Sequence, residues 1–290
     1  MSTIQTEICA CDLCGSTDSV LIWDKSKDWF PTVKICGEDI HHKDVMCKNC
    51  GLVYKNPRMT RESLDLFYKE EYRKMYGENP ESEQMHALNA YRLIVGIRGS
   101  LLDIGCAGGK LLNLWKGEKC GVEPGQNKPD GAYASIKDVP KKYDIVTMLN
   151  TLEHVYSPTE TLQEIYDVCG KYLLISVPEF FNTNITRAVS AYLSNAHLYT
   201  FTRPAIRAML KKCGFNVLKI YSLPEEIGNK LYILSEKGEP SEATYYKPDM
   251  NIVRDFMRAW YTMTNIKMKL EADEICGKIG NDTAIIKGGQ

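Results

Sequence analysis

The feature that most constrains the fold is a glycine-rich turn between two apolar segments, at residues 101–114. The run Leu101-Leu102-Asp103-Ile104 leads into Gly105-Cys106-Ala107-Gly108-Gly109, and leucines follow at 111, 112 and 114. An apolar strand, a tight turn and a helix with one buried side are typical of the first unit of a parallel α/β sheet. Glycine lets the backbone approach a ligand where a Cβ atom would collide. The stretch therefore predicts a ligand site at the carboxyl end of a strand.

Residue identities exclude two phosphate-binding versions of this turn. A P-loop needs glycine at 104 and a hydroxyl side chain at 111, where the chain has Ile104 and Leu111. The dinucleotide fingerprint needs glycine at 107 and 110, where the chain has Ala107 and Lys110.

Two acids indicate what the turn binds instead. Glu123 closes the next apolar segment, and an acid at the end of a second strand can accept both hydroxyls of a ribose. Asp103 lies beside the loop, where it could orient loop amides or the ammonium of an amino-acid moiety. A ribose and an amino acid without a phosphate describe S-adenosylmethionine.

Five motifs in order make the chain similar to a known family: residues 102–109, 121–124, 143–155, 197–202 and 213–215. With this order and spacing the chain resembles the class I S-adenosylmethionine-dependent methyltransferases. The resemblance implies a doubly wound, mostly parallel, seven-stranded α/β sheet that is Rossmann-like, with S-adenosylmethionine as the cofactor. The alternative is a loop that serves only a tight turn. The expected cofactor-binding residues are Asp103, Gly105, Cys106, Ala107, Gly109, Glu123, Pro124 and Asn150.

Two Cys-x-x-Cys-Gly knuckles near the N-terminus predict a metal site. Cys11 and Cys14 form one and Cys47 and Cys50 the other, with 32 residues between them. Four thiolates leave a tetrahedral Zn²⁺ no open position, so we expect one structural zinc in a small ribbon. Redox-active or merely packed cysteines are the alternative. The expected ribbon core is Trp23, Trp29, Phe30 and Val33, and the spare ligands are Cys9, Cys36, His41 and His42.

Composition bounds the partners and the location. The 290 residues carry a net charge of −1, which gives no general attraction to nucleic acid or an anionic membrane. No apolar run approaches the length of a membrane span, and the N-terminus has no signal-peptide pattern. We expect a cytoplasmic protein that binds a small molecule, with homodimerisation possible.

The pattern of the chain divides it into a zinc ribbon (1–57), a helical linker or lid (58–98), a cofactor-binding core (99–238) and a C-terminal helical extension (239–290). Helices are expected over 60–76, 82–95, 158–170, from 203 to about 213, and 251–274. The expected N-caps of the first, third and fourth are Thr60, Ser157 and Thr202. Apolar runs predict strands over 143–149 and 172–178, and a terminal hairpin over 216–222 and 230–235. The segment 124–142 is too short and too rich in proline and glycine for a normal helix, strand and loop. It leaves only a short strand near 132–136 and Lys137-Asp138 as a candidate reader of adenine.

The expected catalytic residues follow the strand ends. His197 is the predicted general base, because its segment should face the acceptor and the matching histidine of related sugar methyltransferases lies in the acceptor site. A histidine that only tethers this segment is the alternative. His154 is expected on the cofactor side, and Glu153 and Tyr199 are weaker candidates for acceptor contacts.

A zinc ribbon, a linker with Asn56-Pro57-Arg58 and Phe67-Tyr68, and this core together resemble methyltransferases of sugar and secondary-metabolite pathways. The leading functional hypothesis is therefore methylation of a small polar acceptor, with a sugar hydroxyl of a nucleotide-sugar or surface-glycan precursor as the expected acceptor. The resemblance favours O-methylation over C-methylation, because similar sugar C-methyltransferases usually carry a further long C-terminal domain and only about fifty residues follow the last strand here. An RNA methyltransferase with a zinc module and a non-catalytic zinc-ribbon interaction protein are the alternatives.

Overall fold

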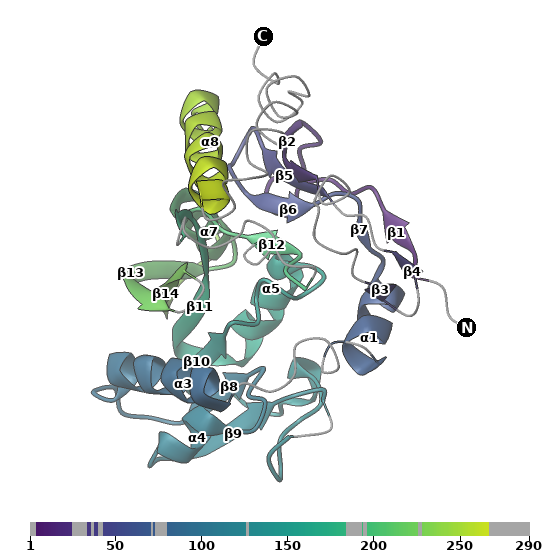
Figure 1. Ribbon diagram of the computed structural model, residues 1–290. Coiled ribbons are helices and arrows are strands. Elements are labelled where there is room, and N and C mark those ends of the chain that lie inside the picture. The colour runs from purple at the N-terminus through teal and green to yellow at the C-terminus, as the bar shows by residue number, and fades with distance from the viewer. Residues whose placement is uncertain are drawn as a thin grey trace.

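A six-stranded sheet is the centre of the molecule. The structure is a computed structural model, and it describes residues 4–24, 34–35, 38–39, 43–70, 72, 80–125, 128–183, 193, 196–225 and 228–266. The strand order is β13-β14-β11-β10-β8-β9 (Figure 1). The bounds are β8 (Leu101–Ile104), β9 (Lys119–Val122), β10 (Tyr143–Leu149), β11 (Cys169–Thr183), β13 (Phe215–Glu225) and β14 (Gly228–Lys237).

Four of these strands are parallel, and the predicted hairpin closes one edge. β8 pairs in parallel with β9 on one side and with β10 on the other, and β10 pairs in parallel with β11. β14 is antiparallel to both β11 and β13, as the sequence predicted for a terminal hairpin. The strand order reverses direction at β8, and ligands of open α/β sheets bind outside the carboxyl ends of the strands at such a point. The turns after β8 and β10 therefore flank the expected site.

The predicted count of seven strands is not what the described residues show. The segment expected to form a strand near 132–136 contributes one isolated parallel bridge, Val122 to Tyr133. It then turns into the 3₁₀ helix η2 (Ile136–Asp138), in which the Ser135 hydroxyl accepts a hydrogen bond from the Lys137 amide. The segment is short and carries several prolines and glycines, so the chain reaches β10 before a longer ladder can form.

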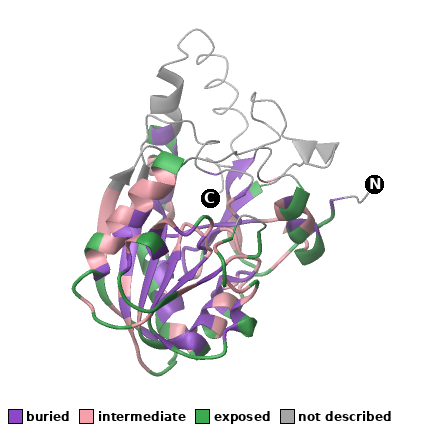
Figure 2. Cartoon of the chain, turned by 90° about the horizontal axis from the view of Figure 1, so that it is seen from below, coloured by how far each residue is buried: buried purple, intermediate pink, exposed green. Residues whose placement is uncertain are grey.

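Helices cover both faces of the sheet, and local signals explain where they begin. The bounds are α3 (Pro80–Ile94), α4 (Lys110–Leu114), α5 (Pro158–Val168) and α7 (Arg203–Lys212). The Ser157 hydroxyl caps α5 by accepting from the Glu160 amide, and the Thr202 hydroxyl caps α7 in the same way, as predicted. The predicted stop of α5 at Gly170 is wrong, because Cys169 is already extended and begins β11. The central strands are buried between these layers (Figure 2).

The N-terminal module is a second, antiparallel sheet that is completed by a strand of the core. Its order is β12-β6-β5-β2, with β2 (Ser19–Asp24), β5 (Lys43–Cys47), β6 (Val53–Lys55) and β12 (Tyr199–Thr200). β1 (Thr6–Glu7) with β7 (Arg58–Met59), and β3 (Lys34–Ile35) with β4 (Glu38–Asp39), form two separate two-stranded antiparallel sheets. Buried residues of this module and of the large sheet form one continuous apolar cluster.

Two further helices complete the described chain. α1 (Arg61–Glu70) follows the module, and the Thr60 hydroxyl caps it as predicted by accepting from the Ser63 amide. α8 (Met250–Ile266) lies beside the N-terminal sheet (Figure 1). Its Val253, Met257 and Trp260 pack with Trp23 and Phe180, so the helix is docked onto the body of the protein. The other expected ribbon-core residues, Trp29, Phe30 and Val33, lie outside the described residues.

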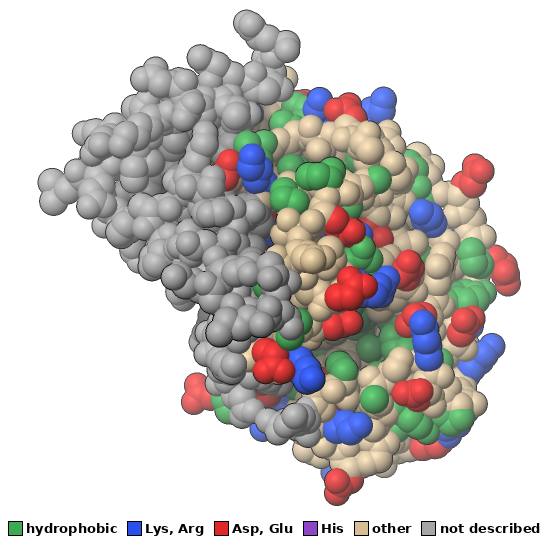
Figure 3. Space-filling model, turned by 90° about the vertical axis from the view of Figure 1, so that its right-hand side faces the viewer, with side chains coloured by type: hydrophobic (Ala, Val, Ile, Leu, Met, Phe, Trp, Pro, Cys, Tyr) green, Lys and Arg blue, Asp and Glu red, His purple; other side chains and the backbone are tan. Residues whose placement is uncertain are grey.

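The described surface and helices agree with the net charge of −1 and with the short apolar runs of the sequence. Acidic and basic side chains alternate across the described part of the face in Figure 3. Among the described residues, the helices are all too short or too polar to traverse a bilayer.

Candidate active site and metal centre

The loop after β8 is held in a conformation that depends on glycine. Gly105 and Gly109 have φ values of +71° and +76°, and Ala107 between them has +42°. A Cβ atom added to Gly105 would lie 2.4 Å from the hydroxyl oxygen of Thr151. The loop therefore lies directly against the turn that follows β10, which brings the two turns at the reversal point together.

Glu123 lies at this loop, as the sequence predicted for an acid at the end of the second strand. One carboxylate oxygen accepts a hydrogen bond of 3.0 Å from the Ala107 amide, and the other accepts one of 2.8 Å from the Gly125 amide. Each carboxylate oxygen has capacity for a further hydrogen bond. The half-buried carboxylate can therefore support the loop and still accept a vicinal diol, so the residues fit a ribose. Pro124, which follows it, is exposed.

Asp103 is buried beneath the loop. One of its oxygens accepts a hydrogen bond of 2.6 Å from the Thr147 hydroxyl. Burial raises the pKa of Asp103 to about 7, and this hydrogen bond acts in the opposite direction. The sequence reasoning missed Thr147, although a hydroxyl in the otherwise apolar β10 was a signal. Cys106 is also buried, and its sulfur lies 2.5 Å from where a Cβ atom on Gly121 would be, so it packs the loop onto β9.

Asn150 turns the chain at the end of β10. Its φ is +48°, an uncommon value for a residue other than glycine. The Ser176 hydroxyl of β11 donates to the Asn150 side-chain oxygen and accepts from its amide, both at 3.0 Å. This clamp fixes the direction in which residues 151–154 leave the sheet.

Glu153, His154 and His197 come together beyond that clamp. Each has one ligand-type atom within 4.8 Å of the other two. The His154 and His197 rings meet edge to face with centroids 4.9 Å apart, and His154 Nε2 is 4.0 Å from a Glu153 carboxylate oxygen. The Glu153 side chain is only 1% exposed, and neither oxygen has a hydrogen-bond partner among the described residues. Burial lowers the pKa of His154, against the opposing effect of Glu153.

Three residues around this group were not predicted. The Ala196 carbonyl lies 2.9 Å from His154 Nδ1 and accepts its hydrogen bond. The rings of Tyr68 and Tyr72 contact His154 edge to face, with centroids 6.1 and 6.0 Å away. Their i, i+4 spacing was a signal for one aromatic helix face, but not for what that face would meet.

Tyr199 has different surroundings from the other predicted acceptor contacts. Its hydroxyl accepts from Arg58 at 2.8 Å and donates to the Tyr156 carbonyl at 2.9 Å. The side chain is buried where the N-terminal module meets the core, and burial raises its pKa well above the ordinary value. We therefore leave Tyr199 out of the proposed acceptor site.

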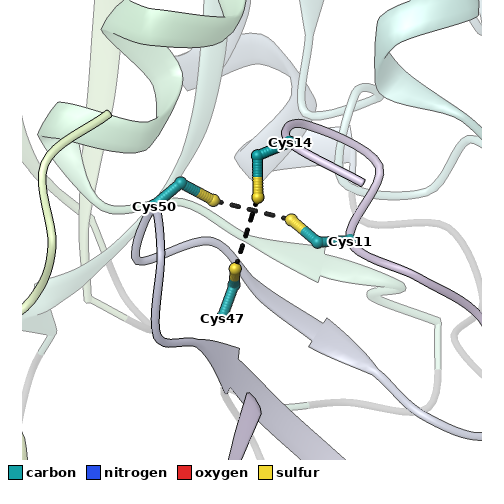
Figure 4. Close-up of side chains that lie close together, drawn as sticks. All are labelled: Cys11, Cys14, Cys47 and Cys50. Atoms are coloured by element: carbon teal, nitrogen blue, oxygen red, sulfur yellow. Dashed lines mark hydrogen bonds between the residues drawn. The ribbon is translucent and has the colours of Figure 1, made fainter. Parts of the chain in front are cut away.

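The four knuckle cysteines converge on one point (Figure 4). The sulfurs of Cys11 and Cys50 are 3.5 Å apart, as are those of Cys14 and Cys47. Because the crowded sulfurs share protons, the pKa of Cys47 is lowered while the pKa values of Cys11 and Cys50 are raised. The sulfur of Cys9 instead contacts the Lys55 carbonyl, and Cys36, His41 and His42 lie outside the described residues.

Comparison with known proteins decides the family. A model of the methyltransferase domain matches residues 63–220, which is more than half of the chain. The chain belongs to this family. It is an S-adenosylmethionine-dependent methyltransferase, in agreement with the loop, the acid at 123 and the sheet described above.

Solved structures show what this methyltransferase is similar to. Magnesium protoporphyrin IX methyltransferase from Synechocystis, solved with bound S-adenosylhomocysteine, is 14% identical with a TM-score of 0.46, over 59% of this chain and 97% of that one. An S-adenosylmethionine-dependent methyltransferase from Archaeoglobus fulgidus is 19% identical with a TM-score of 0.45, over 57% and 97%. These likenesses carry no argument about the substrate. A comparison with curated proteins finds no match.

Proposed function

We propose that this methyltransferase transfers the methyl group of S-adenosylmethionine to a hydroxyl of a small polar acceptor. The acceptor that we favour is a sugar of a nucleotide-sugar or surface-glycan precursor. The group of Glu153, His154 and His197 carries the proposal. Glu153 and His154 follow Thr151, which lies against Gly105 of the glycine loop, and this supports a position of the group near the donor. A buried carboxylate beside two imidazoles suits the removal of a proton from a weakly acidic hydroxyl.

The residues of the chain have separate tasks in this proposal. S-adenosylmethionine supplies a methyl group made electrophilic by its sulfonium. Glu123 would hold the ribose hydroxyls, Asp103 would lie at the amino-acid end, and the backbone of residues 105–109 would support the nucleoside. His197 would take the proton of the acceptor hydroxyl, so that its oxygen could accept the methyl group while the cofactor leaves as a neutral thioether. Tyr68 and Tyr72 close one side of the site, which excludes water from the reacting groups.

The choice of a sugar rests on the resemblance of the motifs to sugar methyltransferases. The net charge of −1 and the mixed charges on the described part of the face in Figure 3 favour it over RNA, because an RNA-binding face carries clustered Lys and Arg.

Turnover with a panel of acceptors tests the proposal. We expect S-adenosylhomocysteine to form with a nucleotide-linked sugar and not with structured RNA. His197→Ala should lower turnover by roughly 100- to 10,000-fold, the range of a general base, while cofactor affinity is kept. His86→Ala, on α3, is the matched control and should leave turnover unchanged. Normal turnover of His197→Ala would remove this histidine as the base.

We also propose that Cys11, Cys14, Cys47 and Cys50 hold one structural zinc. Four converging sulfurs on two knuckles match a closed Cys₄ site. The turn glycines Gly15 and Gly51 have φ values of +72° and +74°, which a knuckle of this kind requires. A module this small has little core of its own, so a metal would contribute directly to its folding.

A further inference from the structure

The geometry points to a second metal site, in which Glu153, His154 and His197 bind a divalent first-row transition ion beside the acceptor. This inference rests on the proposed function, because it describes how the same group would act on the acceptor hydroxyl. Three ligand-type atoms from two distant segments lie within 4.8 Å of one another. Two imidazoles and one carboxylate form a ligand set that Zn²⁺ and non-haem Fe²⁺ use with positions left open for a substrate.

The first observation that favours a cation is the Glu153 carboxylate. It is 1% exposed and, within the described part of the chain, neither oxygen meets a hydrogen-bond donor. A buried carboxylate with no partner is costly, whereas a coordinated ion would satisfy both oxygens. Nothing about the packing of the sheet requires an acid here, because Glu153 lies in the turn after β10 and not in a strand.

The second observation is the orientation of the His154 ring. Its Nδ1 lies 2.9 Å from the Ala196 carbonyl, which can only accept, so Nδ1 carries the hydrogen. The neutral ring then carries its lone pair on Nε2, which lies 4.0 Å from a Glu153 oxygen, so two acceptors are neighbours. Metal-binding histidines donate their other N–H to a backbone carbonyl in this manner. The alternative without a metal is a protonated His154 paired with Glu153.

The third observation is the surroundings of the group. Tyr68 and Tyr72 present ring edges to His154, and the Ala196 carbonyl also accepts a hydrogen bond from the Tyr68 hydroxyl at 3.4 Å. Aromatic walls exclude water, and the Tyr68 contact links α1 to the carbonyl that orients His154. An ion held here by three protein atoms would have open positions for a hydroxyl of the acceptor and would lower the pKa of that hydroxyl. His197 would then act as a ligand and not as a free base.

Cobalt uptake by the full-length, zinc-loaded protein tests the inference. Co²⁺ is the probe, and cobalt and zinc are counted per chain after dialysis. We expect the wild type to keep its zinc and to bind one Co²⁺, with a rise in melting temperature. Glu153→Gln and His197→Ala should each lower cobalt affinity at least roughly tenfold, a typical loss for altering a metal site. His86→Ala and a His41→Ala, His42→Ala double variant are controls and should bind Co²⁺ as the wild type does.

Glu153→Gln keeps the inference testable even if cobalt binding is weak. The amide has nearly the same shape as the carboxylate but carries no charge. Because a buried charge without a partner is costly, the metal-free variant should melt at a higher temperature than the wild type, and it should lose the rise that Co²⁺ causes. No cobalt uptake by the wild type, or uptake that Glu153→Gln and His197→Ala leave unchanged, would overturn the inference in favour of the ion pair. If S-adenosylmethionine binding and sugar methylation persist in that case, the proposed function survives with His197 as the base. If neither is found, the proposed function fails separately.

Discussion

Tyr199 lies opposite Tyr54 in an antiparallel pair that joins β12 of the core to β6 of the N-terminal module. The amide of Lys55 in β6 also donates to the Leu198 carbonyl at 3.0 Å. His197 directly precedes these paired residues. The N-terminal module therefore supports the proposed acceptor site, because β6 of the module and β12 of the core belong to one sheet.

Tyr199→Phe should weaken the junction between module and core. The change removes a hydrogen bond accepted from Arg58 and one donated to the Tyr156 carbonyl. We expect the free energy of unfolding to fall by about 1–3 kcal/mol, since one of these bonds involves a charged donor. Denaturant unfolding measures this, with the exposed Tyr246→Phe as the control. Equal stability of Tyr199→Phe and the wild type would show that the bonds contribute nothing.

Cys47→Ser should release the zinc that we propose. We expect zinc content to fall from about one to near zero per chain, and the melting temperature to fall with it, because metal binding and folding of such a module are coupled. Turnover should fall more than cofactor affinity, since β12 loses its supporting sheet while the glycine loop does not. Elemental analysis and thermal unfolding are the measurements. The control is Cys120→Ser, whose thiol contacts the Gly121 and Gly131 carbonyls instead of the cluster. A metal-free yet fully folded wild type would contradict the zinc proposal.

Glu123→Ala should weaken S-adenosylmethionine binding. A hydrogen bond to a charged group contributes about 1.5–3 kcal/mol, so the loss of even one should raise the dissociation constant roughly 10- to 100-fold. Part of the loss would come from the Ala107 amide, which loses its acceptor. Calorimetric titration gives the value, and Glu118→Ala removes an exposed carboxylate paired with Lys141 as the matched control. An unchanged dissociation constant would remove Glu123 as the ribose ligand.

Asp103 should make the ligand-free protein less stable as pH rises. Burial raises its pKa from 3.8 to about 7, so between these values the folded state binds more protons than the unfolded state. The free energy of unfolding therefore falls through this window, and by pH 8 the loss from this group is at most about 4 kcal/mol.

Asp103→Asn should remove that dependence and raise stability at pH 8, while weakening cofactor binding if the carboxylate faces the ammonium group. Denaturant unfolding at pH 5 and pH 8 measures the slope. Asp144→Asn is a useful contrast: hydrogen bonds from Ser100 lower the pKa of Asp144, so this residue should not contribute to the slope over that range. The same slope in wild type and Asp103→Asn would show that Asp103 is not the titrating group.

Local signals in the chain determined the parts that depend on near neighbours. The glycine turn, the acid at the end of β9, the caps at Ser157 and Thr202, and the two cysteine knuckles are short-range patterns with a definite backbone geometry. They were sufficient for the methyltransferase fold and for the class of cofactor, because each of these features is formed by residues close together in the chain. The predicted seventh strand failed at Tyr133, where the number of residues needed to reach β10 limited the pairing to one bridge.

Only the tertiary structure decided that Glu153, His154 and His197 meet. The sequence marked each of the three, but their meeting depends on the Asn150–Ser176 clamp, on the Ala196 carbonyl and on the pairing of β12 with β6. It likewise decided that Tyr199 supports the module junction and that Tyr68 and Tyr72 reach His154. Each of these contacts joins residues far apart in the chain, and the packing of whole elements, which no local pattern encodes, sets their distances.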